Sequence, residues 1–176
     1  MYWIPAFQIL ERRGFAVCLV NARHVKNVSG RKSDILDCQW IQRLHSYGLL
    51  NASFRPADPM CVLRSYLRYR DELVCARSVQ CQHLQQALQQ MNVQLHQVLS
   101  DVTGVSGLRI IEAILTGERN GRTLARLADR RVRASQATVE KALRGDYRAE
   151  HLFVLQTAFD LYQTYEQKIH LCDEQI

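Results

Sequence analysis

Residues 81–98 read CQHLQQALQQMNVQLHQV, a segment rich in glutamine that contains neither glycine nor proline. Its apolar side chains recur alternately three and four positions apart, at Cys81, Leu84, Leu88, Met91, Leu95 and Val98. This spacing is typical of a helix that buries a narrow apolar stripe against another helix, as in a coiled coil. The segment therefore predicts a mainly α-helical fold organised around one long helix.

The helix that contains this stripe is expected to begin well before it. Asp58 followed by Pro59 is a start signal, an N-cap and a first-turn proline, and neither glycine nor proline follows until Gly104. A helix over residues 58–101 would measure roughly 65 Å at about 1.5 Å per residue. We therefore expect this helix to project from the rest of the chain.

A partner for the stripe is present in the last part of the sequence. From Ala149 onward the apolar positions of a second long helix are Leu152, Leu155, Phe159, Tyr162 and Ile169. Shorter helices are expected between the two, over residues 107–115 and 135–143. Residues 58–176 are thus expected to form a helical coiled-coil hairpin with an elaborated tip, although an ordinary helical bundle explains the stripe equally well.

The stripe also favours association with a second copy of the chain. Residues 78–100 contain no formally charged side chain, so no ion pairs select one partner over another. An apolar seam on a projecting arm is expected to be covered in solution. We therefore expect a homo-oligomer that forms through Cys81, Leu84, Leu88, Met91, Leu95 and Val98.

The first 57 residues predict a different organisation. Residues 15–20 read FAVCLV, the continuous apolar run of a buried parallel strand, and residues 52–55 are a weaker strand candidate. A short helix that ends at Gly14 precedes the first candidate. Because a buried strand needs neighbours on both edges, the region is expected to be a small α/β remnant of a larger sheet domain.

Length and charge set the class of protein. The 176 residues exclude a large multi-domain enzyme, and 23 lysines and arginines against 17 acidic residues give a formal net charge of +6. This balance favours polyanionic partners. The longest apolar run, residues 15–20, is far below the roughly 20 residues of a membrane span, so we expect a cytoplasmic protein without a membrane segment.

A basic loop precedes two acids at a helix start. Its potential cations are Arg23, His24, Lys26, Arg31 and Lys32. Ser33 can cap the helix that follows, in which Asp34 and Asp37 share one face and offer oxygen ligands that suit Mg²⁺. The loop suits a phosphate backbone that approaches the same edge. Acids in a first turn also complement the helix dipole, so this structural explanation stays open.

A second basic region follows the long helix. It holds Arg119, Arg122, Arg126, Arg130, Arg131 and Arg133. In a continuous helix all of these except Arg131 would share one face, a shape that can follow the phosphates of DNA or structured RNA. A solvated helix face is the alternative.

Residues 21–40, NARHVKNVSGRKSDILDCQW, closely resemble the end of the RuvC-like domain in the DEDD insertion-sequence transposases, the IS110 family. Residues 2–5, 44–50, 53–56, 103–106 and 147–148 fit the same family. The resemblance implies a ribonuclease-H-like fold whose four acids bind Mg²⁺, then a helical coiled-coil region and a separate domain with a serine nucleophile. It further implies that DNA is the substrate and that a guide RNA is a possible partner.

Matched by position, Asp34 and Asp37 resemble the last two acids of the DEDD set and are the catalytic and metal-binding candidates. The family's first acid and its glutamate have no counterpart in this sequence, which ends near the point where the serine domain would follow. We therefore expect a truncated and catalytically incomplete transposase. Two alternatives stay open: a non-catalytic nucleic-acid-binding module, and an α-helical dimerisation protein that interferes with intact transposase.

Overall fold

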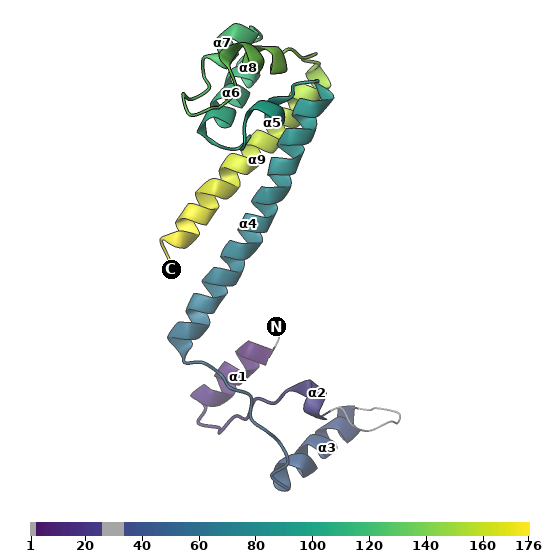
Figure 1. The fold of residues 1–176 in the computed structure, drawn as a ribbon. Helices are drawn as coiled ribbons and strands as arrows, with labels where there is room; N and C mark the ends of the chain where they lie inside the picture. Colours follow the sequence, from purple (N-terminus) through teal and green to yellow (C-terminus); the bar gives the residue numbers. More distant parts are fainter. Residues whose placement is uncertain (1–2, 26–33) are drawn as a thin grey trace. The chain divides into compact units, whose positions relative to one another are not determined.

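The computed structural model describes residues 3–25 and 34–176, apart from the side chains of His24 and Asp34. Over these residues the chain forms nine helices and no strand (Figure 1). It divides into two compact units, Met1–Cys61 and Val62–Ile176, and the division falls in the first turn of a long helix. The helices are α1 (Trp3–Arg12), α2 (Ala22–Val25), α3 (Asp34–Ser46), α4 (Asp58–Gln90), α5 (Leu95–Val98), α6 (Val105–Leu115), α7 (Gly121–Ala125), α8 (Gln136–Ala142) and α9 (Ala149–Asp173). No helix in the described part is long and apolar enough to cross a membrane.

Glycines end both main helices of the first unit. Gly14 after α1 and Gly48 after α3 have φ values of 81° and 68°. Glycine adopts this left-handed conformation without strain because it has no Cβ. At the first of these ends, the amide of Phe15 donates to the carbonyl of Leu10 at 3.1 Å. The predicted helices before Gly14 and after the basic loop are therefore confirmed.

The predicted strand over residues 15–20 is wrong. Within the described residues, its pairing is limited to one antiparallel bridge between Val20 and Ala52, beside which the amide of Ser53 donates to the carbonyl of Leu19. Phe15 is 60% exposed. A run of apolar residues becomes a buried strand only when neighbouring strands satisfy its backbone, and one bridge does not supply them.

The first unit packs around a single aromatic ring. Phe7 is the one buried side chain among its described residues, and the edge of Trp3 meets the Phe7 ring at a centroid distance of 5.9 Å. The guanidinium of Arg55 lies 4.5 Å above the same ring. It also pairs with Glu11 and Asp58, each at 2.7 Å. A cation–π and ion-pair cluster thus takes the place of an apolar core.

In the second unit, α4 and α9 lie side by side and run in opposite directions (Figure 1). Arg70 pairs with Asp173 and, two turns later on α4, Arg77 pairs with Glu166, which lies two turns earlier on α9. Between and beyond these ion pairs, apolar side chains of the two helices meet in two clusters. The predicted pairing of the long helix with a helix from residue 149 onward is therefore confirmed.

The long helix ends earlier than predicted. α4 stops at Gln90 because Asn92 takes the left-handed conformation, with φ 58°. The amide of Val93 then donates to the carbonyl of Leu88 at 2.8 Å, which closes a Schellman-type helix end. Asparagine tolerates this conformation better than other side chains, so it ends the helix without glycine or proline.

The apolar stripe is confirmed as a packing face but not as an exposed seam. Leu84, Leu88, Met91 and Leu95 are buried within the second unit, and Cys81 and Val98 are half-buried against the same core. α9 and the short helices between α4 and α9 cover the stripe. The expectation of self-association through these residues stays a prediction, but the exposed seam on which it was based is covered by the same chain.

Residues 91–148, which we term the head, carry the four short helices α5 to α8 between the two long ones (Figure 1). The buried side chains of α6, α7 and α8 that form its centre are Ile110, Ile111, Ile114, Leu124, Ala125 and Val139. Ser135 caps α8, because its side chain accepts the amide of Thr138 at 3.2 Å. The short helices predicted over residues 107–115 and 135–143 are confirmed.

Candidate nucleic-acid interface

The basic loop and the two acids of the first unit are placed only in part. Arg23 is exposed on α2, and Asp37 is exposed on α3. Lys26, Arg31, Lys32 and Ser33 lie outside the described residues, as do the side chains of His24 and Asp34. The indole Nε1 of Trp40 donates to the carbonyl of Val25 at 3.2 Å. This bond ties α3 to the end of α2, so the helices on either side of the loop are held together.

The six arginines of residues 119–133 do not lie on one helix. The shared face expected for a continuous helix is therefore not formed. Arg119 precedes α7, Arg122 lies on it, and Arg126 is its C-terminal cap. Arg130, Arg131 and Arg133 follow on the irregular segment that leads to α8. After α7 the amides bond three residues back, as in the bond from Leu127 to Leu124 at 3.1 Å. This tighter winding ends the α-helical repeat, so the arginines do not share one helix face.

All six of these arginines are exposed, and none forms an ion pair with a carboxylate among the described residues. The nearest acids in the sequence bind backbone amides instead. Asp129 accepts the amide of Arg131 at 2.9 Å, and one oxygen of Glu118 accepts the amides of Arg119 and Asn120 at 2.9 and 2.8 Å. These carboxylates shape the loops.

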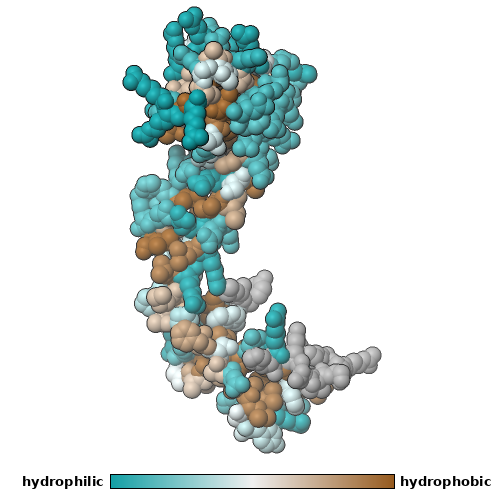
Figure 2. Space-filling model, viewed as in Figure 1, coloured by the Kyte–Doolittle hydropathy of each residue, from teal (hydrophilic) through white to brown (hydrophobic). Residues whose placement is uncertain are grey.

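The head carries an excess of positive charge. Its residues, 91–148, include ten lysine and arginine side chains against six acidic ones. On the visible face in Figure 2, long hydrophilic side chains project from the head around a smaller apolar area. Such a surface suits a ligand that presents several phosphates.

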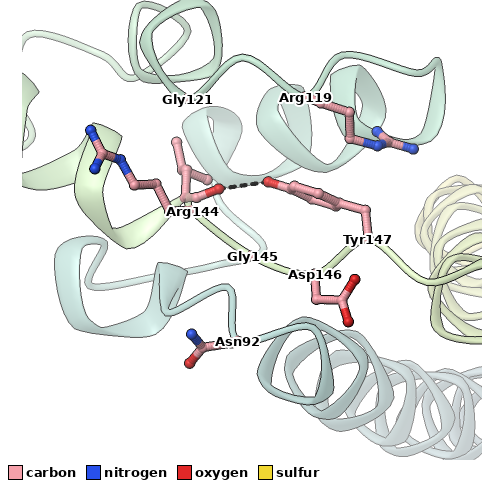
Figure 3. Close-up of a pocket in the computed structure, with 8 residues that line it drawn as sticks. Asn92, Arg119, Gly121, Arg144, Gly145, Asp146 and Tyr147 are labelled. Atoms are coloured by element: carbon pink, nitrogen blue, oxygen red, sulfur yellow. Dashed lines mark hydrogen bonds between the residues drawn. The ribbon is translucent and has the colours of Figure 1, made fainter.

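The head also contains a pocket of about 470 Å³ (Figure 3). Three segments far apart in the sequence form it: the turn after α4, the loop before α7 and the loop between α8 and α9. Its lining residues are Asn92, Arg119, Gly121, Leu143, Arg144, Gly145, Asp146 and Tyr147. The volume lies within the range of about 300–1,000 Å³ found for small-ligand sites.

Arg119 and Tyr147 form the wall of this pocket. The guanidinium of Arg119 lies 4.7 Å from the centre of the Tyr147 ring, and its Nη1 donates to the carbonyls of Ile114 and Glu118. The hydroxyl of Tyr147 donates to the carbonyl of Leu143 at 2.6 Å. Burial raises the pKa of Tyr147, while the charge of Arg119 opposes the rise. The phenol therefore stays neutral and keeps its donor at neutral pH.

Gly145 fixes the floor of the pocket. A Cβ at this position would lie 2.6 Å from Cγ2 of Val93 and closer still to the carbonyl oxygen of Met91. The amide of Asp146 donates to that same oxygen at 2.8 Å. The loop between α8 and α9 can thus approach the end of α4 only with glycine here.

A protein-family model described as a DEDD transposase of the IS110 type matches residues 1–93. The chain belongs to this transposase family. No curated protein and no solved structure matches it. The matched residues of this IS110-family chain include α3 with its two acids and all of α4, whereas residues 94–176 lie outside the match.

Membership in the family implies divalent-metal use in general. In the described part of this IS110-family chain, however, no group of three or more histidine, cysteine and acidic side chains is close enough together to hold a metal ion. Asp37 is exposed on α3. The described residues therefore do not by themselves form a complete group of metal ligands, and the side chain of Asp34 lies outside them.

Of the residues that line the pocket, sequence reasoning assigns a binding role to Arg119 alone. It assigns none to Asn92, Arg144, Asp146 or Tyr147. A glycine and an aromatic residue between arginines, as in residues 144–148, were the signal that could have marked the loop. Nothing in the linear sequence joins this loop to Asn92 and Arg119.

Proposed function

We propose that this chain acts as part of an insertion-sequence transposase and binds nucleic acid, with the head as a contact surface. The observation that carries this proposal is the set of six exposed arginines whose neighbouring acids bind backbone amides. Like charges held close together repel one another, and phosphates relieve that repulsion while they release counterions. DNA is the first partner expected of a transposase, and a structured guide RNA offers the same phosphate chemistry.

The basic loop of the first unit is proposed as a second contact surface. Its residues are Arg23, His24, Lys26, Arg31 and Lys32. The family match over residues 1–93 supports this assignment, as does the bond from Trp40 to Val25, which holds together the helices on either side of the loop. Binding by two separate surfaces would make affinity strongly dependent on salt.

Asp34 and Asp37 are proposed to contribute to the metal site of the transposase, with Mg²⁺ as the expected ion. Two carboxylates hold Mg²⁺ only together with further ligands, such as substrate phosphates, water and other acids. The resemblance assigns this sequence only two of the four family acids. We therefore infer that the 176-residue chain binds nucleic acid but does not cleave it unaided.

The proposal is tested by comparing two variants that each remove three positive charges. The head variant carries Arg122→Gln, Arg126→Gln and Arg130→Gln, and the control carries Arg12→Gln, Arg13→Gln and Arg43→Gln, whose arginines are also exposed. With a labelled DNA duplex and a labelled RNA hairpin, the head variant is expected to bind at least tenfold more weakly than the control. Equal affinity of the two variants would assign the head arginines to a solvated surface.

The dimerisation alternative receives no support from the stripe, because its central side chains are buried in the core of the second unit. The alternative of a non-catalytic binding module differs from the proposal only in the role of Asp34 and Asp37. The two are distinguished by adding a protein segment that carries the family's other two acids and measuring whether DNA cleavage then depends on Asp34 and Asp37.

A further inference from the structure

We propose that the pocket of the head binds one unstacked nucleotide of a single-stranded segment, with its base stacked on the outer face of the Arg119 guanidinium. The inference rests on the proposed function, since it names the part of the nucleic acid that the head would select. Of the pocket residues, Arg119 alone also belongs to the six exposed arginines, and the other lining residues are separate from them.

Arg119 is held as a flat platform. One face of its guanidinium lies on the Tyr147 ring, and Nη1 is fixed by two backbone carbonyls. Tyr147 is itself fixed by its bond to the carbonyl of Leu143. Arg119 is nevertheless exposed, so a ligand can reach the face of its guanidinium that is directed away from Tyr147. Guanidinium planes stack on nucleobases, and a plane fixed in advance loses little freedom when it does so.

The other polar groups that line the pocket suit a base edge as well as a phosphate. Figure 3 shows the side chains of Asn92 and Asp146 on one side of Gly145 and the guanidinium of Arg144 on another. The amide of Asn92 both donates and accepts, and the carboxylate of Asp146 accepts from an exocyclic amino group. Arg144, whose pairing with Glu140 is long at 3.6 Å and exposed, is free to turn to the phosphate.

The pocket exists before any ligand arrives. The amide of Gln94 donates to the carbonyl of Ala142 at 2.9 Å, and that of Asp146 to the carbonyl of Met91 at 2.8 Å. These bonds join the end of α4 to the segments on both sides of Leu143. A base inside a duplex cannot enter such a pocket without unstacking, so the site selects single-stranded segments or loops.

The test uses Arg119→Lys, which keeps the charge and removes the plane, in the full chain. The probes are a labelled RNA single strand, a DNA single strand of the same sequence and the corresponding DNA duplex. Arg119→Lys is expected to weaken single-strand binding roughly tenfold, as loss of one stacked base does, and to weaken duplex binding far less, because the positive charge is kept. Arg12→Lys, at an exposed position of α1 outside both proposed contact surfaces, is the matched control and is expected to bind all three probes normally.

A second variant keeps the test decisive if Arg119→Lys disturbs folding. Arg144→Gln removes an exposed pocket charge and Lys141→Gln an exposed charge beside it, and only the first is expected to weaken single-strand binding. If only binding to the RNA single strand is weakened, the pocket binds an RNA nucleotide. If binding to the RNA and DNA single strands is weakened alike, the pocket accepts a nucleotide of either kind. Unchanged single-strand binding by Arg119→Lys and Arg144→Gln, or an equal loss on the duplex, overturns the pocket proposal. If the unaltered chain binds none of the probes, the proposed function itself fails.

Discussion

The phenol of Tyr162 donates to Oε1 of Glu166, 3.1 Å away and one turn further along α9. Arg77 of α4 donates to the same oxygen. One carboxylate therefore joins a buried tyrosine to a cation on the neighbouring helix and fixes how α4 and α9 lie against each other. Burial, together with the charge and the hydrogen bond of Glu166, raises the pKa of Tyr162 to about 12.

This pKa predicts a loss of stability in alkali. The folded-state pKa lies above the ordinary value of 10, so the stabilising contribution is complete below pH 10 and disappears as the pH rises toward 12. Tyr162→Phe removes it. Denaturant unfolding at several pH values is therefore expected to show a difference between the chain and this variant that shrinks above pH 10. A difference that is constant with pH would contradict the assignment.

The ion pair between Arg77 and Glu166 predicts a modest effect on stability. Both side chains are partly exposed, at 30% and 42%, so Glu166→Gln is expected to lower the free energy of unfolding by about 1 kcal/mol. Glu174→Gln, which affects the more exposed pair with His170, is the control and should change it little. Equal effects of the two variants would show that the pair does not stabilise the packing of the helices.

The buried stripe predicts that Leu88 supports the fold of the single chain. Leu88 is 2% exposed, so Leu88→Ala is expected to lower the free energy of unfolding by about 2–5 kcal/mol. Leu171→Ala, at an exposed position of α9, should have a small effect. The oligomeric state of both variants is measured by sedimentation. A stable dimer that Leu88→Ala dissociates would show that the stripe forms a contact between two copies of the chain.

The close approach at Gly145 predicts that a methyl group is not tolerated there. Gly145→Ala is expected to destabilise the head by about 1–3 kcal/mol, since neither the Met91 carbonyl nor Val93 can move without disturbing the end of α4. At Gly104 the nearest atoms to an added Cβ lie at 3.4 Å, so Gly104→Ala serves as the control. Thermal unfolding of the two variants checks the difference.

The proposed absence of two of the four family acids predicts that the chain does not cut DNA. Incubation with Mg²⁺ and a supercoiled plasmid is expected to give no nicking, with or without Asp34→Asn and Asp37→Asn. Cleavage that depends on Mg²⁺ and disappears in either variant would mean that these acids act with ligands not recognised in the sequence.

Local signals made most helices predictable. Gly14 ends α1, the Asp58–Pro59 pair begins α4, and Ser135 caps α8, so that each boundary depends on residues adjacent in the sequence. Asn92 ends α4 in the left-handed conformation, which asparagine adopts only occasionally, so its presence in the sequence does not mark the helix end as glycine would.

The remaining features depend on contacts between distant segments. Residues 15–20 have the composition of a buried strand, but a strand also requires partners, and composition does not reveal whether they are there. The arginines were found from their spacing, yet their arrangement depends on where α7 ends. The pocket joins Asn92, Arg119 and Tyr147, which come together only when the head is folded.

The salt dependence of duplex binding tests the central claim most directly. Each phosphate contact adds about 0.9 to the slope of log affinity against log salt concentration. The head variant, Arg122→Gln with Arg126→Gln and Arg130→Gln, is expected to lower this slope by about 2–3 relative to the charge-matched control at Arg12, Arg13 and Arg43. A head variant with the same slope and affinity as the control would contradict the account.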